Sequence, residues 1–479
     1  MTSSACRYAS LTTATRAVLL CATLAGEVSA AEADSDIRRV AEHLRDQALA
    51  GSQAWRVLES LTTEIGARPV GSPAMARARD WGVTTLKALG FEDVHVEEFV
   101  KENAWFRGAE SAEVTAPYPH ALAILGLGNS VPTPTRGIEA QIAMFWGFED
   151  LTATPSGALA NRIAVLNQPI TAAQGEEGYR AAARGRRDGP SVAAARGAVG
   201  FLVRSLSTGD SRLPHTGATR YAEGAPRIPA AALGVPDVEL LERLVARGQP
   251  VTVRMSLAST VIAKAPAWNV VGDLVGRDTS TEMLVIGGHL DSWDVAEGAT
   301  DDGAGMAICL AAAHLIAQQP QRPRRTIRIV LWGSEETGGS GAAFAQAHRD
   351  GIPKVVLASE SDMGSGRIYR IAFSVDAWND PRLLELAAIL APLGILPDQK
   401  PATFAGTDVE DLRKAGVPIV RMSQDARGYF ATHHSADDTL NKVDRSDLEQ
   451  NVAAWSAMLY VIAESGVDLR NTALHSPEN

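Results

Sequence analysis

Short apolar runs alternate with polar clusters along the second half of the chain. Residues 282–286, 326–332 and 354–358 are rich in aliphatic and β-branched side chains, and their length predicts buried strands. Between the first two runs, apolar residues recur at helical spacing over 303–318, which predicts a helix with one apolar face. Strand, helix and strand in this order predict an α/β sheet.

The two ends of the mature chain continue this pattern. A helix is expected over 75–89 and a strand at 94–96, and both belong with the sheet of the second half. Near the carboxyl terminus, 446–449 has the sequence of a capping box. The apolar face that follows predicts a core helix, with contacts from Leu448, Val452, Trp455 and Leu459.

The middle of the chain, from 122 to 259, has a different texture. It holds two predicted strands, at 161–167 and 197–203, and an apolar stretch at 228–233 that leads into a helix ending near 247. A glycine- and arginine-rich stretch at 183–189 is expected to be an exposed loop. We therefore expect a separate domain here, inserted into the first sheet.

Polar clusters of metal-binding residue types follow the predicted strands of the second half. They are His289 with Asp291, Asp301 with Asp302, Glu335 with Glu336, Asp362, and His433 with His434. Imidazole and carboxylate ligands suit zinc, and an odd, shared carboxylate suits two ions. One further carboxylate remains for proton transfer, so the pattern predicts metal-assisted hydrolysis. Adjacency leaves open which member of each glutamate or histidine pair is the ligand.

The amino terminus and the net charge bear on location and partners. Arg7 and Arg16 precede an apolar run at 17–25, and small residues at 28–30 offer a cleavage site. The run is too short to span a bilayer, so we expect a signal peptide over 1–30 and a secreted or periplasmic protein that does not stay in the membrane. A net charge of −11 argues against nucleic-acid binding.

The polar clusters resemble, in order and spacing, those of the co-catalytic dizinc exopeptidases, in the carboxypeptidase Q-like branch. Further matching motifs lie at 68–73, at 269–272 and at 406–408. The resemblance implies an α/β fold of the zinc exopeptidase, aminopeptidase-like type, with a mixed central sheet flanked by helices. It also implies a division of the chain into a signal peptide over 1–30, a catalytic domain over 31–121 and 260–479, and a β-rich protease-associated insert over 122–259.

The resemblance implies two Zn²⁺ per chain. In that pattern His289 and Asp362 bind one ion, Glu336 and His434 bind the other, and Asp301 bridges both.

The same pattern makes Glu335 the general base. It places Asp291 behind His289 to fix the tautomer of the imidazole. A cis peptide bond is expected between Asp301 and Asp302.

The implied substrate is a dipeptide or short peptide. We expect Asp408, Arg427 and His433 on the substrate side of the site. An aminopeptidase with the same metal ligands is the alternative within the family, and a non-catalytic peptide-binding or receptor-like protein is the alternative of another class. The resembled branch also favours a homodimer.

Overall fold

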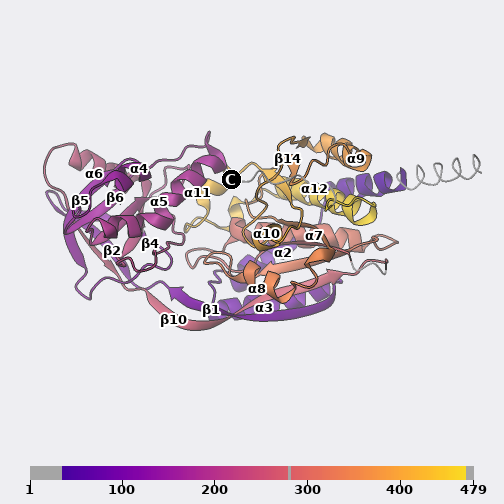
Figure 1. Ribbon diagram of the computed structural model, residues 1–479, viewed down its shortest axis with the longest axis horizontal. Coiled ribbons are helices and arrows are strands. Elements are labelled where there is room, and N and C mark those ends of the chain that lie inside the picture. Colours follow the sequence, from indigo (N-terminus) through magenta and orange to yellow (C-terminus); the bar gives the residue numbers. More distant parts are fainter. Residues whose placement is uncertain (1–34, 279–281, 471–479) are drawn as a thin grey trace, which may run out of the picture.

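The computed structural model describes residues 35–278 and 282–470. The predicted signal peptide lies outside these residues. Two bodies of secondary structure lie at opposite ends of a long β-ribbon formed by β1 (Glu92–Phe106) and β10 (Thr260–Leu274), as Figure 1 shows. Figure 1 also shows that segments from both ends of the sequence build the body on the right.

The first body holds a five-stranded mixed sheet in the order β1, β10, β12, β11, β13. Its inner strands are β12 (Thr326–Trp332), β11 (Met283–His289) and β13 (Val355–Glu360), and β11 is parallel to both neighbours. The three strands predicted in the second half are therefore confirmed. Because parallel strands end at one edge of a sheet, the polar residues that follow them gather there.

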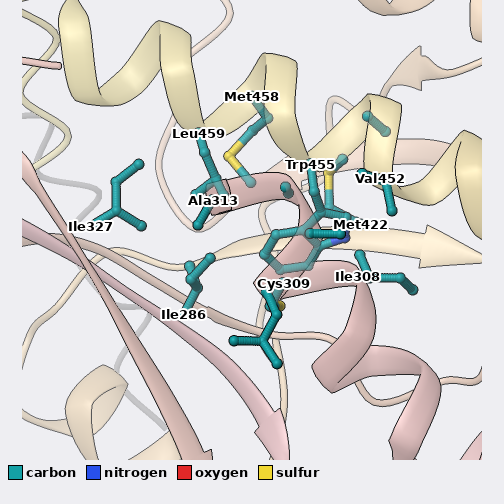
Figure 2. Packing of buried hydrophobic residues seen from close by; sticks show 14 of the residues in the cluster. Ile286, Ile308, Cys309, Ala313, Ile327, Met422, Val452, Trp455, Met458 and Leu459 are labelled. Atoms are coloured by element: carbon teal, nitrogen blue, oxygen red, sulfur yellow. The ribbon is translucent and has the colours of Figure 1, made fainter. Parts of the chain in front are cut away.

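Helices cover both faces of this sheet. The expected helix is α7 (Ala304–Ala317), which lies between the sheet and α12 (Arg445–Glu464). Figure 2 shows Trp455 and Leu459 of α12 together with Ile308, Cys309 and Ala313 of α7 in one buried cluster. The helices α2 (Ala54–Ser60) and α3 (Pro73–Ala88) pack in the same cluster on this face. On the other face, Phe344 of α8 (Ser340–Ala347) and Leu412 of α10 (Glu410–Lys414) pack against the sheet.

The start of α12 differs from the prediction. The capping residue is Asp444, whose side chain accepts hydrogen bonds from the backbone N–H groups of Ser446 and Asp447. With its cap two residues before the expected one, the helix also begins two residues earlier than a capping box at 446–449 implies.

The second body is built on an eight-stranded sheet in the order β3, β2, β9, β5, β6, β7, β8, β4. The bounds of these strands are β2 Glu110–Ala116, β3 His120–Leu122, β4 Ile124–Gly126, β5 Ile138–Phe145, β6 Arg162–Leu166, β7 Gly200–Arg204, β8 Ala230–Leu233 and β9 Thr252–Leu257. Separate apolar clusters lie on its two faces. The helices are α4 (Phe148–Ala153), α5 (Gly175–Ala195) and α6 (Val235–Val245).

The prediction of an exposed loop at 183–189 is wrong, because the whole stretch lies within α5. Its glycines are contact points of the helix with the sheet. A Cβ atom at Gly185 would lie 2.5 Å from Leu166, and one at Gly189 would lie 2.5 Å from Phe201. The glycines therefore allow α5 to pack closely on the sheet. Arg186, which lies between them in the sequence, is also buried.

A smaller three-stranded sheet, of β15 (Leu396–Pro397), β14 (Ile368–Phe373) and β16 (Val420–Gln424), lies beside α9 (Pro381–Leu390). The short helices α8 (Ser340–Ala347), α10 (Glu410–Lys414) and α11 (Tyr429–Thr432) border the edge where the parallel strands end. In the part of the chain that the structure describes, none of the helices has the length and apolarity needed to span a bilayer.

Candidate metal centre

The strand β11 ends on His289 at a point of very close packing. A Cβ atom at Gly287 would lie 1.9 Å from the carbonyl oxygen of Val330, and one at Gly288 would lie 2.4 Å from Asp302 Oδ2. The two glycines before His289 therefore let β11 approach its neighbours closely, and the imidazole that follows is fully buried.

Asp301 lies between the two predicted histidine ligands. Its Oδ1 is 3.0 Å from His289 Nε2, and its Oδ2 is 3.1 Å from His434 Nε2. Glu336 Oε2 lies 3.2 Å from the same nitrogen of His434, and Asp362 Oδ1 lies 3.5 Å from His289 Nε2. The two histidines thus face the Asp301 carboxylate, and each of them also faces one further carboxylate.

The electrostatics of this cluster follow from burial and from mutual contacts. Burial raises the pKa of Glu336 to about 8 and that of Asp362 to about 7. Burial alone would also raise the pKa of Asp301, but the facing imidazoles of His289 and His434 hold it well below its usual range. Burial lowers the pKa of each histidine, and the facing carboxylates more than offset this. A divalent cation bound among these buried carboxylates would offset their negative charge.

Two further observations support metal binding by these side chains. The ligand atoms of His289, Asp301 and Glu336 lie within 4.8 Å of one another, and so do those of His289, Asp302 and Asp362. Within the described residues, Asp301 Oδ2, Glu336 Oε1 and Asp362 Oδ1 are buried oxygens without a hydrogen bond. Buried polar atoms of this kind are normally satisfied, and a bound cation would satisfy all three.

Asp302 was not predicted as a ligand, and its carboxylate has other partners. Its Oδ2 accepts the N–H of His289 at 3.0 Å, and its Oδ1 accepts the N–H of Gly305 at 3.1 Å. The side chain thus joins β11 to the start of α7. The peptide bond between Asp301 and Asp302 is cis, which confirms the expectation from the resemblance.

The segment that carries Asp301 is held from two sides. Asp438 accepts the backbone N–H groups of Thr300 at 2.6 Å and of Asp301 at 3.2 Å. On the other side, the guanidinium of Arg68 is fully buried and donates to backbone carbonyls at 290, 297 and 298. The sequence motif around Arg68 therefore organises the centre without supplying a ligand.

Asp291 lies one residue beyond Leu290, behind the imidazole of His289. The backbone carbonyl of Asp291 accepts the hydrogen of His289 Nδ1 at 2.9 Å, whereas its carboxylate Oδ1 is 3.8 Å from that nitrogen. The carboxylate instead receives the backbone N–H groups of Glu335 and Glu336. It thus fixes the loop that carries the predicted base.

The three predicted substrate residues have different surroundings. Asp408 is buried and accepts hydrogen bonds from Ser340 Oγ and from the N–H of Gly341 at the start of α8. Arg427 is exposed, pairs with Asp425, and lines a cavity of about 1200 Å³ that none of the predicted metal ligands lines.

His433 is the third, and it is fully enclosed. Its ring stacks on Tyr429 at 4.7 Å between centroids and meets Tyr179 edge-on at 5.0 Å. Neither ring nitrogen of His433 has a hydrogen bond within the described residues. Burial and the neighbouring His434 and His215 hold its pKa well below the ordinary value.

Several residues at the centre carry no local sequence signal. The ring of Trp293 lies 5.7 Å from that of His434 and lines a small pocket with Asp301 and Glu336. Arg186 and Thr216, from the second body, reach His434 from its other side. A motif could not have identified these two, because they lie more than 200 residues from His434 in the sequence.

Fold and site together define a metal-dependent hydrolase with an aminopeptidase-like α/β fold. Residues 269–459 match peptidase family M28. Carboxypeptidase Q from Bos taurus is 35% identical over 416 residues, which is 87% of this chain and 86% of the relative. Carboxypeptidase Q from Homo sapiens is 33% identical over 430 residues, or 90% of this chain and 89% of the relative. The chain belongs to peptidase family M28 and is a metallopeptidase.

Solved structures agree with this assignment. A peptidase M28 precursor from Shewanella amazonensis is 38% identical, with a TM-score of 0.89 over 92% of this chain and 99% of that one. An aminopeptidase from Aneurinibacillus is 18% identical, with a TM-score of 0.58 over 87% of this chain and 95% of that one. The second comparison concerns the fold alone, and it has the same mixed α/β architecture.

Proposed function

We propose that this protein is an exported exopeptidase with two zinc ions, and that it hydrolyses dipeptides or short peptides. As a member of family M28 it is a zinc-dependent exopeptidase. The observation that carries the proposal is the placement of the Asp301 carboxylate, with one oxygen facing His289 and the other facing His434. A carboxylate shared in this way can bridge two ions.

The proposed ligand sets follow from these contacts. His289 and Asp362 would hold one ion, Glu336 and His434 would hold the other, and Asp301 would be shared between them. When bound, zinc supplies Lewis acidity toward a peptide carbonyl and toward water. The backbone carbonyl of Asp291 keeps the hydrogen of His289 on Nδ1, so that Nε2 offers its lone pair to the ion.

Glu335 is the proposed general base. Its backbone N–H is fixed by Asp291, and its neighbour Glu336 already faces His434. The Glu335 carboxylate accepts a proton from the attacking water and delivers it to the leaving amine. This assignment divides the adjacent pair into one base and one ligand.

The proposed substrate class rests on the similarity to carboxypeptidase Q over most of both chains. We infer that a free dipeptide is the preferred substrate, with His433 as the leading substrate-side candidate because its buried ring nitrogens are without partners in the described chain. Asp408 and Arg427 keep weaker support, since both have partners of their own.

The test compares three substrates with and without a chelator. A free dipeptide, the same dipeptide amidated at its carboxyl terminus, and a longer peptide are incubated with the full-length protein. Cleavage of the free dipeptide alone supports the proposal. Equal cleavage of the amide and the longer peptide would mean that the substrate carboxylate is not recognised, and the enzyme would then be an aminopeptidase.

The domain division and the assembly are further parts of the proposal. We infer that residues 122–259 form most of a protease-associated insert that limits substrate length, supported by the eight-stranded sheet whose strands span 110 to 257. A homodimer and export by the signal at 1–30 complete it. Size-exclusion chromatography with light scattering tests the dimer, and the amino-terminal sequence of secreted protein tests the export.

A further inference from the structure

We propose that Arg186 and Thr216 are positioning residues for His434, and that metal binding at His434 and the seating of the segment around Thr216 stabilise each other. The inference rests on the proposed role of His434 as a ligand. Neither residue lies within 269–459, the part matched to the family. Both come from the body built on the eight-stranded sheet, Arg186 on α5 and Thr216 in the connection from β7 to β8.

The imidazole of His434 has two different environments. Nε2 faces the carboxylates of Asp301 and Glu336, as described above. Nδ1 lies 3.3 Å from the backbone oxygen of Thr216. A carbonyl oxygen can only accept, and the two hydrogens of the nearby Arg186 Nη1 are already donated to Thr216 and Tyr179. The ring hydrogen of His434 therefore lies on Nδ1, and the lone pair of Nε2 is left for a metal. The Thr216 carbonyl therefore fixes both the tautomer and the ring orientation.

The two segments also contact each other through their backbones. The N–H of Thr216 donates to the carbonyl oxygen of His434 at 2.8 Å. Thr216 and His434 thus exchange two hydrogen bonds, one through the backbone and one through the imidazole. The residue His434 itself has a positive φ of 59°, an uncommon conformation for a side chain of this size. Its geometry is consequently tied to a segment of the other body.

Arg186 holds the Thr216 carbonyl from the other side. Its Nη1 donates to that oxygen at 3.2 Å and to the hydroxyl of Tyr179 at 3.1 Å, and it lies 3.3 Å from His434 Nδ1. Arg186 is buried, with a relative exposure of 7%, and its Nε has no hydrogen bond within the described residues. Burying a guanidinium in this way is costly, which points to a positional role for Arg186 at this carbonyl.

The backbone beside Thr216 is shaped around this guanidinium. Gly217 has a φ of 132°, and a Cβ atom there would lie 2.3 Å from Arg186 Nη1. A glycine is therefore needed for the guanidinium to reach the carbonyl. The side chain of Thr216 is fixed separately, since its hydroxyl donates to the carbonyl of Gly126 at 2.7 Å and receives Arg107 Nη2 at 3.3 Å.

The consequence is a reciprocal coupling. A metal ion that holds Nε2 of His434 in place also holds Nδ1 against Thr216. Thermodynamic linkage then requires that the seated Thr216 segment strengthens metal binding by the same factor. Loss of the Arg186 contact should therefore weaken metal binding. Outer partners of metal-bound imidazoles typically contribute about 10- to 100-fold in affinity.

The first experiment measures zinc affinity by competition with a chromogenic chelator on the full-length protein. Arg186→Met is compared with Arg186→Lys and with Arg184→Met, a control on the same helix with a largely exposed side chain. We expect Arg186→Met to lower the affinity for one zinc equivalent by about 10- to 100-fold. Arg186→Lys should lower this affinity less, and Arg184→Met should leave it unchanged. Unchanged affinity in a folded Arg186→Met protein would overturn the inference.

The second experiment needs no variant of Arg186. Backbone hydrogen exchange over 214–218 is followed in the wild-type protein with and without zinc, and in His434→Ala. We expect zinc to slow exchange of the Thr216 amide in the wild type and to leave it unchanged in His434→Ala. An exchange rate of the Thr216 amide that is the same with and without zinc in the wild type would contradict the coupling, even if Arg186→Met does not fold.

The two proposals fail separately. If His434→Ala keeps both zinc equivalents, His434 is not a ligand and the proposed metal assignment is wrong. If His434→Ala loses one equivalent but the Arg186 variants and the Thr216 amide do not respond, the ligand assignment stands and only the positioning role is refuted.

Discussion

The carboxylate of Asp291 accepts the backbone N–H of Glu335, with Oδ1 at 2.9 Å from the nitrogen. Its second oxygen accepts the N–H of Glu336 at 3.3 Å. The loop after β11 is thereby joined to the loop after β12, and the predicted base and one predicted ligand share a single anchor. The contact with His289 that the resemblance implied is made by the Asp291 backbone instead.

Asp291→Asn should disturb the position of Glu335 without removing a proposed metal ligand. An asparagine side chain has one acceptor oxygen, and its NH₂ group would face a backbone N–H. We expect kcat to fall by about 10- to 100-fold with a smaller change in KM, because Glu335 moves relative to the substrate. Asp437→Asn, at a partly exposed site, is the matched control. Wild-type kcat in Asp291→Asn would show that the anchor is dispensable.

Glu335→Gln tests the base directly. The amide cannot accept the proton, so we expect turnover to fall by at least about 10²- to 10⁴-fold while both zinc equivalents remain bound. Glu336→Gln should behave differently and lose zinc, since Glu336 faces His434. Elemental analysis beside a dipeptide assay distinguishes the two. A metal-loaded, active Glu335→Gln protein would require another base.

Asp301→Ala should remove both zinc equivalents at once. Its two oxygens face different histidines, so no other single residue of the cluster touches both. His434→Ala, by contrast, should lose one equivalent. Metal content after dialysis against a weak chelator is the measurement, and one retained equivalent in Asp301→Ala would show that the carboxylate does not bridge.

Much of the first body could be predicted because its signals are local. The apolar runs before His289, Glu335 and Asp362 have the length of buried strands, and parallel pairing brings their ends to one edge. The expectation that these side chains converge needs only that topology, and the observed distances among them agree with it.

Other features depend on contacts that no local pattern records. The stretch 183–189 has the composition of a loop, but its glycines allow α5 to pack against Leu166 and Phe201. The contact between Arg186 and His434 joins residues 248 positions apart. The cap at Asp444 was missed because several polar residues compete at that helix start, and only the backbone angles decide among them.

Arg68 offers a prediction about stability. Its side chain is fully buried and donates to four backbone carbonyls, those of Gly66, Leu290, Glu297 and Gly298. A lysine has a single ammonium group on a flexible stem and cannot reproduce the planar fork. Each unsatisfied buried carbonyl costs about 1–3 kcal/mol, so Arg68→Lys should destabilise the first body by about 3 kcal/mol.

Denaturant unfolding of the metal-loaded protein measures this effect. We expect a lower transition midpoint and weaker activity together, because the carbonyls that Arg68 holds belong to the loop leading to Asp301. Arg77→Lys, at an exposed position on α3, should change stability by less than about 0.5 kcal/mol. If Arg68→Lys unfolds at the wild-type midpoint, the loop is held by its other contact, the Asp438 carboxylate at Thr300.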